Sequence, residues 1–198
     1  MATHDTGRVF PSTDWEVRLP EALGFDEERL ERARRHIDEA AGTSPYRVVV
    51  VRGGYLVVDW RRGIDAGSRL GQASASKSYF SCLLGIAVAE GVIPSADARV
   101  VDVYPEMMDV GPGEGPKPGR QAFDKNRAIT FRQLIGNTSG YMKPGEAPGM
   151  VFHYQTFGMN ILTNSLATAY GLYDSSDPDR LPGANRLLEE KIRNPIGG

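Results

Sequence analysis

The chain has 198 residues, of which 40% are hydrophobic and 24% are charged, and its formal net charge is −2. This is the composition of an ordinary globular protein that is long enough to form a substantial core. Because the sequence contains no basic stripe and no Lys/Arg run, it does not indicate a nucleic-acid-binding protein. No apolar run approaches the ~20 residues of a membrane span, and the start of the sequence lacks the apolar segment of a secretory signal. We therefore expect a cytoplasmic protein.

The cysteine and histidine content argues against a metal centre. A single cysteine, Cys82, excludes an intrachain disulfide and any cysteine-based metal site. It lies in the apolar run FSCLLGIAV, so we expect it to be a small buried hydrophobic side chain. No H-x-x-H pattern or acidic cluster with the spacing of a cation-binding loop is present, and the sequence implies no cofactor.

The chain is expected to begin with an irregular lead-in, residues 1–25, that contains two prolines and is followed by a helix. This helix is predicted from about Asp26, a plausible N-cap, to Ala41, and Gly42 is expected to end it. We assign residues 26–70, which contain this helix and the segment that follows it, to an α/β subdomain.

The segment YRVVVVRGGYLVVDWRRG predicts a β-hairpin. Two β-branched and aromatic runs flank Gly53-Gly54, and glycine readily supplies the positive φ angles of a tight turn. A two-stranded hairpin alone is marginal in water, because its apolar face needs further strands or helices to cover it. The hairpin has four such apolar side chains, and they are Val48, Val50, Leu56 and Val58. They predict a sheet larger than two strands.

Residues 71–198 are predicted to form a mostly helical subdomain. The first two predicted helices are separated by DVGPGEGPKPGRQAFDKN, Asp109 to Asn126, which is a long loop dense in Gly and Pro. A later helix is expected to place four apolar residues on one face, and they are Ile161, Leu162, Leu166 and Ala169. In chain order, the predicted helices lie at about 74–90, 130–136, after 151 and at 184–192.

A serine and a lysine, Ser74 and Lys77, lie three residues apart at the start of the first of these helices. Residues at this spacing project from the same helical face, so the hydroxyl and the amine can approach each other. Serine needs a base to become a nucleophile, and lysine can be that base only if its pKa falls. The free N–H groups at the helix start also favour an anionic oxygen. Taken alone, however, the S-x-x-K pattern favours a structural alternative, in which Ser74 is an N-cap and Lys77 a solvated residue.

Four segments in order carry a more specific signal, and they are SASKSYFSCLLGIAVAEGVI, ADARVVDVYPEM, AITFRQLIGNTSGY and FHYQTFGMNILTNSLATAYG. Together they resemble the serine β-lactamase and penicillin-recognising family, and more closely its class C β-lactamase and family VIII esterase branch. The resemblance covers Ser74 to Gly171, about half of the chain. It implies an α+β fold with an antiparallel sheet flanked by helices, a mostly helical subdomain and a cleft between them.

The resemblance also implies roles for single residues. Ser74 matches the nucleophile, Lys77 matches its partner base, and Tyr154 in HYQT matches a tyrosine that relays protons. Without the resemblance, we would expect Tyr154 to be an aromatic side chain of the core. Thr156 stands where β-lactamases usually have asparagine, which favours ester substrates because threonine offers a single hydroxyl. We expect Thr156 and His153 to contact substrate, although solvent exposure or a turn contact is the simpler role for His153.

Two departures from the family pattern bear on this interpretation. Asn137 stands where the family often has histidine, and we interpret it as a structural turn residue. No K-T-G or H-x-G segment follows Tyr154, and the sequence ends near the family's P-L-G segment, here Pro195-Ile196-Gly197. By resemblance, the carboxy-terminal strands are missing, so we expect a companion chain or a missing segment to supply such a strand. Alone, the chain is expected to expose a sheet edge.

The sequence thus predicts a serine hydrolase that forms an acyl-enzyme with small-molecule esters, and secondarily with amides or β-lactams. Two alternatives remain open. One is an acyltransferase with the same serine chemistry. The other is a non-catalytic half-domain that binds a companion chain.

Overall fold

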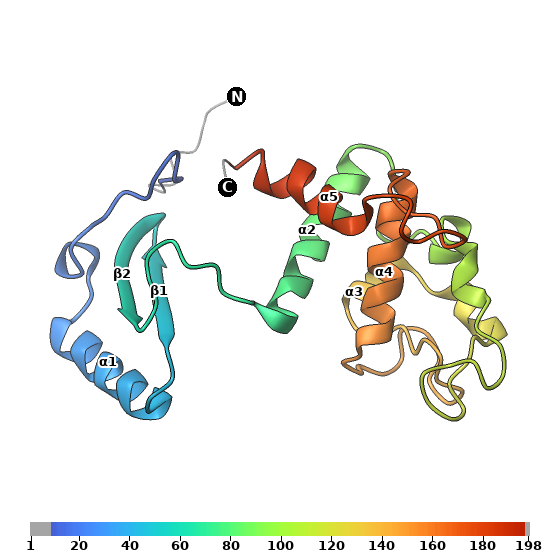
Figure 1. Cartoon of the computed structure of the whole chain (residues 1–198), viewed down its shortest axis with the longest axis horizontal. Helices are drawn as coiled ribbons and strands as arrows, with labels where there is room; N and C mark the ends of the chain where they lie inside the picture. The colour runs from blue at the N-terminus through green and yellow to red at the C-terminus, as the bar shows by residue number, and fades with distance from the viewer. Residues whose placement is uncertain (1–8, 197–198) are drawn as a thin grey trace. The chain divides into compact units, whose positions relative to one another are not determined.

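The structure is a computed structural model that describes residues 9–196 (Figure 1). The chain divides into two compact units, of which the first ends at Gly71 and the second runs from Gln72 to Ile196. Each unit is described separately below. Across residues 9–196, no helix is both long enough and apolar enough to cross a membrane.

The first unit contains one long helix and one hairpin. Helix α1 begins as predicted, because the Asp26 side chain accepts a hydrogen bond from the Arg29 amide at 2.9 Å, and Gly42 ends it with a φ of 55°. The hairpin turn is formed by Gly53 and Gly54, whose φ angles of 61° and 88° suit only glycine well. The elements of this unit are η1 (Glu21–Leu23), α1 (Glu27–Ala41), β1 (Tyr46–Arg52) and β2 (Tyr55–Arg62).

The sheet of the first unit has two antiparallel strands, with Val50 opposite Val58. The lead-in adds an isolated parallel bridge between Val17 and Leu56. Val49 and Val51 remain exposed on β1. The larger sheet predicted from the hairpin's apolar residues is therefore not formed within residues 9–196, and part of its apolar surface faces solvent.

The second unit is helical and contains most of the core. Helices α2 and α4 contact each other, and each of them also contacts α3 and α5; Figure 1 shows α4 running alongside α2. The longer helices lie near their predicted positions, although residues 73–76 form a 3₁₀ turn before the α-helix starts at Lys77. The elements are η2 (Ala73–Ser76), α2 (Lys77–Ala89), η3 (Val100–Asp102), η4 (Pro105–Met108), η5 (Asp124–Ala128), α3 (Phe131–Ile135), α4 (Thr156–Ala169), α5 (Gly183–Leu188) and the π-helical η6 (Glu189–Arg193).

The core of the second unit follows the predicted apolar face of α4. Leu162 and Leu166 are fully buried, Ile161 is buried, and Ala169 packs at the edge of the same cluster. Helix α3 begins with a capping box, in which Thr130 accepts a hydrogen bond from the Gln133 amide at 3.3 Å and its own amide donates to the Gln133 side chain at 3.0 Å. This cap fixes where the short helix starts.

The expectation that Cys82 is buried is wrong, because its side chain is exposed. Helix α2 is apolar on nearly all sides, so the sequence does not show which side is covered. The structure buries Leu83, Leu84 and Ala87, and Cys82 lies on the opposite side of the helix.

Candidate active site

The predicted serine and lysine meet at the start of α2. Ser74 lies on the 3₁₀ turn η2 and Lys77 is the first residue of α2. The Lys77 Nζ atom donates a hydrogen bond to Ser74 Oγ at 3.0 Å. Ser74 is exposed and Lys77 is half-buried, so reagents in solution can reach the hydroxyl.

Ser74 does not cap the helix. The N-cap position of α2 is occupied by Ser76, whose hydroxyl donates to the Ala73 carbonyl at 2.6 Å. Ala73 has a φ of 43°, which is uncommon for a residue with a side chain and costs on the order of 1 kcal/mol. A locally strained turn therefore presents Ser74, and strained turns are frequent at functional sites.

Tyr154 lies close to this pair although it is 80 positions away in the sequence. It belongs to the non-helical segment before α4, and the centre of its ring is 5.6 Å from Lys77 Nζ. Hydrogen bonding with Ser74 is the largest influence on the pKa of the phenol and lowers it. The hydrogen bond and the charge of Lys77 lower this pKa further, and partial desolvation opposes both effects. Ser74 and Lys77 therefore stabilise the phenolate form of Tyr154.

A cavity of about 490 Å³ brings the three side chains together. Its wall contains both polar and apolar side chains, since serine and asparagine lie in it together with aliphatic residues. A carbonyl group entering it would find the Ser74 hydroxyl at the surface and proton-transfer groups beside it. The lining residues are Ser74, Lys77, Ser78, Ser81, Ile135, Asn137, Tyr154 and Met159.

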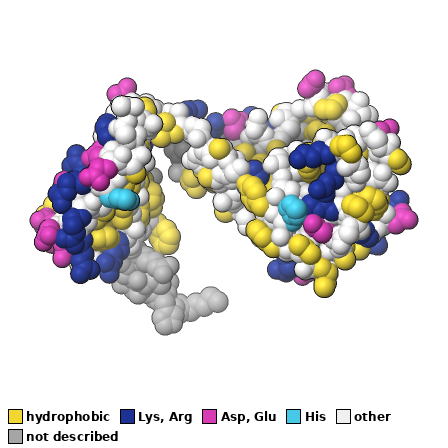
Figure 2. All heavy atoms as spheres, turned by 90° about the horizontal axis from the view of Figure 1, so that it is seen from below, with side chains coloured by type: hydrophobic (Ala, Val, Ile, Leu, Met, Phe, Trp, Pro, Cys, Tyr) yellow, Lys and Arg dark blue, Asp and Glu magenta, His cyan; other side chains and the backbone are white. Residues whose placement is uncertain are grey.

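His153 and Thr156, the predicted substrate contacts, are not among the residues that line this cavity. The His153 Nδ1 atom lies 3.0 Å from Glu146 Oε1, and Glu146 also pairs with the buried Lys143 at 2.9 Å. Thr156 is the first residue of α4 and is exposed. Figure 2 shows basic, acidic and histidine side chains gathered in the middle of one face of the helical unit.

Three residues that line the cavity were not predicted from the sequence, and they are Ser78, Ser81 and Asn137. Ser78 and Ser81 follow Ser74 at a spacing of four and then three residues, which places all three on one face of the helical segment. Polar residues with helical periodicity in an otherwise apolar helix were the signal that could have identified the serines. Asn137 was assigned to a turn, which it does form, but its contribution to the cavity depends on tertiary structure.

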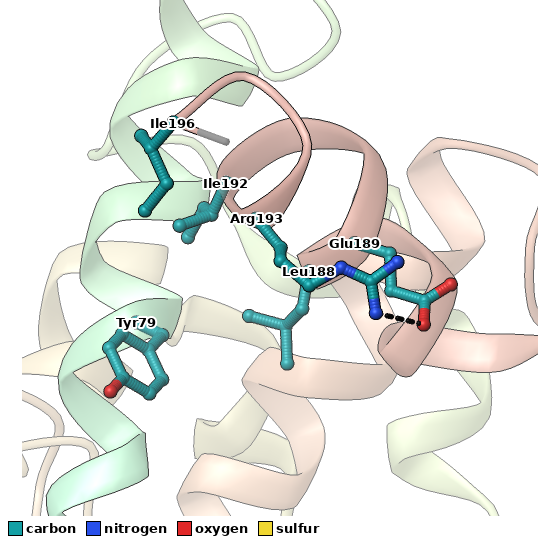
Figure 3. Close-up of a pocket in the computed structure, with 6 residues that line it drawn as sticks. All are labelled: Tyr79, Leu188, Glu189, Ile192, Arg193 and Ile196. Atoms are coloured by element: carbon teal, nitrogen blue, oxygen red, sulfur yellow. Dashed lines mark hydrogen bonds and ion pairs between the residues drawn. The ribbon is translucent and has the colours of Figure 1, made fainter. Parts of the chain in front are cut away.

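A second cavity, of about 320 Å³, lies between α2 and the last helices (Figure 3). Its wall is mainly aliphatic, and its two charged residues neutralise each other, with Arg193 Nη1 2.9 Å from Glu189 Oε1. No nucleophile with a nearby base lines it. The remaining lining residues are Tyr79, Leu188, Ile192 and Ile196. The candidate nucleophile and its neighbouring amine therefore line the first cavity and not this one.

No family model matches the chain, and no curated protein matches it. Among solved structures, the chain is similar to the crystal structure of a "putative beta-lactamase" from Bacteroides dorei DSM 17855, with a TM-score of 0.64 and 19% sequence identity. The match covers 87% of this chain and 52% of that protein. The likeness shows a β-lactamase-like fold, in agreement with the predicted α+β class. The chain spans about half the length of that protein.

Proposed function

We propose that this chain carries the reactive site of a serine hydrolase that works through an acyl-enzyme. The observation that supports this most directly is the 3.0 Å hydrogen bond between Lys77 Nζ and Ser74 Oγ, with the Tyr154 ring 5.6 Å from the same amine. A nucleophile within hydrogen-bond reach of a base, with a third group beside the base, is the arrangement that covalent catalysis requires. The β-lactamase-like fold is compatible with this chemistry.

The proposed reaction has two steps. Ser74 Oγ attacks a carbonyl carbon while its proton passes to the Lys77–Tyr154 pair. Tyr154 then protonates the leaving oxygen or nitrogen as the bond between this atom and the carbonyl carbon breaks. Water then attacks the acyl-enzyme and gives one proton to the same pair. As the bond between the acyl carbon and Ser74 Oγ breaks, the pair returns this proton to Oγ, which restores the Ser74 hydroxyl, and the acid is released. The lowered pKa of Tyr154 supports this role, since it favours a phenolate that can accept the first proton.

Esters are the proposed substrates, ahead of amides and β-lactams. Thr156 offers one hydroxyl where an asparagine would offer both a donor and an acceptor to a substrate amide. We propose Thr156 and His153 as substrate contacts, although neither residue lines the cavity. Because the Nδ1 atom of His153 is engaged in a hydrogen bond with Glu146, its Nε2 atom is the ring nitrogen that can contact a substrate. We further propose that the protein belongs with the class C β-lactamase and family VIII esterase branch.

The proposal includes a companion chain or a further segment that supplies a K-T-G or H-x-G strand. That strand would provide a second oxyanion donor and further substrate contacts. The 52% coverage of the similar structure and the exposed Val49 and Val51 on the hairpin support this part of the proposal. The same exposed strand supports the second candidate function, a non-catalytic half-domain that binds a companion chain.

Labelling with a fluorophosphonate tests the proposed chemistry. We expect intact-mass analysis to show one adduct and peptide mapping to place it on Ser74. Ser74→Ala should abolish labelling, and Lys77→Ala should slow it by about 10²-fold or more, because a positioned base is lost. Ser81→Ala is the matched control, since Ser81 lines the same cavity without contacting the amine, and it should label within a few-fold of the wild type. Labelling at another residue, or an unchanged rate in Lys77→Ala, would contradict the proposal.

A further inference from the structure

We propose that Asn137 is a positioning residue that holds Tyr154 in the site from both sides. The inference rests on the proposed function and concerns the placement of the phenol. The Asn137 carbonyl accepts a hydrogen bond from the His153 amide at 2.8 Å, and the Asn137 side-chain oxygen accepts one from the Gln155 amide at 3.4 Å. A single residue therefore binds the backbone immediately before and immediately after Tyr154.

Tyr154 depends on these bonds because little packing holds its side chain. Its exposed fraction is 53%, and it lies in a non-helical segment. An exposed ring on an irregular segment is free to swing unless its backbone is anchored. Displacement of a reacting group by about 1 Å can cost about 10²-fold in rate. The two hydrogen bonds that Asn137 accepts therefore fix the backbone on both sides of Tyr154, and this backbone determines where the phenol lies.

The conformation of Asn137 explains why this residue suits the position. Its φ is 54°, in the left-handed region, and it directly follows Gly136, the C-cap of α3. Asparagine, aspartate and glycine adopt this conformation more readily than other residues. Of these three, glycine lacks the side-chain oxygen that the Gln155 amide needs. Two separate requirements, a left-handed backbone and an acceptor, therefore meet in Asn137.

The neighbouring residues extend the same support. The Thr138 carbonyl accepts a hydrogen bond from the Gly149 amide at 2.7 Å, and the Gln155 side chain donates to Ser139 Oγ at 3.5 Å. The turn at residues 137–139 thus supports the segment before α4 through hydrogen bonds. In this arrangement Asn137 contacts the segment at Tyr154 itself, while Thr138 and Ser139 secure it on either side.

A second set of bonds secures the loop that leads to this segment. Lys125 Nζ donates to the carbonyls of Gly140 and Glu146 at 2.9 and 2.6 Å, which closes the loop between them. The Glu146 side chain then reaches His153, next to Tyr154. These contacts limit how far the segment can move as a whole, so the loss of the Asn137 side chain should alter the local placement of Tyr154 without unfolding the unit.

Two substitutions separate positioning from a purely structural role. Asn137→Gly keeps the left-handed backbone and the bond from the His153 amide, but it removes the acceptor for Gln155. Asn137→Asp keeps both the backbone conformation and the acceptor. For each variant we would measure the labelling rate of Ser74 by a fluorophosphonate against reagent concentration and pH. Thermal unfolding would be followed alongside.

We expect Asn137→Gly to lower the limiting labelling rate by about tenfold or more at an unchanged half-saturating concentration, with little change in thermal unfolding. Asn137→Asp should return the limiting rate at high pH to near the wild-type value. The plateau at high pH is the quantity to compare, because the added carboxylate itself raises the pKa of a nearby phenol. A wild-type limiting rate in Asn137→Gly, or no recovery in Asn137→Asp, would overturn the inference.

A measurement that does not require reactivity distinguishes this inference from the proposed function. Tyrosine labelled with ¹³C in the ring reports the titration of Tyr154 by NMR. In Asn137→Gly we expect the pKa of Tyr154 to rise toward that of free tyrosine, because the phenolate loses Ser74 and Lys77 as partners. If wild-type Ser74 does not react at all, the proposed function fails, and this titration still decides whether Asn137 places the phenol. An unchanged titration would contradict the inference alone.

Discussion

The helical unit from Gln72 to Ile196 buries a continuous apolar core, whereas the unit that ends at Gly71 leaves most of its apolar side chains partly exposed. Within residues 9–71, Val57 is the one hydrophobic side chain that is buried. Polar contacts join α1 to the hairpin instead, since Arg62 pairs with Asp38 at 3.0 Å and the Tyr46 hydroxyl donates a hydrogen bond to Asp38 at 2.7 Å. The two units therefore depend on different kinds of interaction.

This difference explains where the candidate chemistry is located. Ser74, Lys77 and Tyr154 all belong to the unit that has its own core. A hydroxyl, an amine and a phenol keep a reactive geometry only on a rigid support. The unit with few buried apolar groups contributes no residue to the cavity lining.

The two units can be followed separately in one experiment. Both tryptophans of the chain, Trp15 and Trp60, lie in the first unit. Tryptophan fluorescence therefore reports the first unit, while far-UV circular dichroism is dominated by the helices of the second. We expect the fluorescence transition in urea to come at a lower concentration than the circular dichroism transition, because fewer apolar groups stabilise the first unit.

The largest effect is expected from a substitution in the helical core. Leu162 is fully buried on α4, and Leu162→Ala should lower the free energy of unfolding of the second unit by about 2–5 kcal/mol. The circular dichroism midpoint should fall while the fluorescence midpoint stays in place. Leu70→Ala is the control, since Leu70 is 49% exposed and its loss should move neither midpoint. A joint shift of both signals in Leu162→Ala would show that the units unfold together.

A smaller effect is expected at the start of α3. Thr130→Ala removes the N-cap hydroxyl and should cost about 1 kcal/mol, again in the circular dichroism transition. Thr130→Ser retains the hydroxyl and should stay close to the wild type. Equal losses in both variants would mean that the methyl group, and not the cap, stabilises this position.

The smallest effect is expected in the first unit. Asp38→Asn removes the charge that pairs with Arg62 and weakens the hydrogen bond from the Tyr46 hydroxyl, which is 2.7 Å long. For partly exposed ion pairs the cost is about 0.2–1 kcal/mol, and it should lower the fluorescence midpoint alone and less so at high salt. Asp65→Asn, at an exposed position, serves as the charge control. Because α1 belongs to the first unit, the part of the circular dichroism change that it contributes should follow the fluorescence. A fall in the midpoint of the larger part, which the helices of the second unit contribute, would contradict the separation of the two units.

Local signals in the sequence predicted much of this fold. The cap at Asp26 and the glycine pair of the hairpin each act within a few residues, so their patterns can be recognised directly. The exposure of Cys82 could not be predicted, because it depends on which side of an apolar helix is covered. The 3₁₀ turn that carries Ser74 was also missed, since helix boundaries are set by small differences in hydrogen bonding.

The candidate site was predictable only in part. The spacing of Ser74 and Lys77 indicated that their side chains could approach each other, because helical geometry brings residues three apart together. The pattern alone nevertheless favoured an N-cap serine and a solvated lysine, and only the resemblance to a family favoured a reactive pair. The position of Tyr154 rested on resemblance to a family, since no local rule relates residues so distant in the sequence. The hydrogen bonds that Asn137 accepts from both neighbours of Tyr154 depend on how the end of α3 docks against the segment before α4. A turn motif does not specify this docking.

The long stretch of chain between Ser74 and Tyr154 has a consequence for folding studies. The candidate site cannot exist until the segment before α4 has docked beside the start of α2, so the labelling proposed for Ser74 would depend on tertiary structure and not on helix formation alone. Pulses of reagent given at successive times after dilution from denaturant would record when that docking occurs, in a chain where the tryptophans report on the other unit.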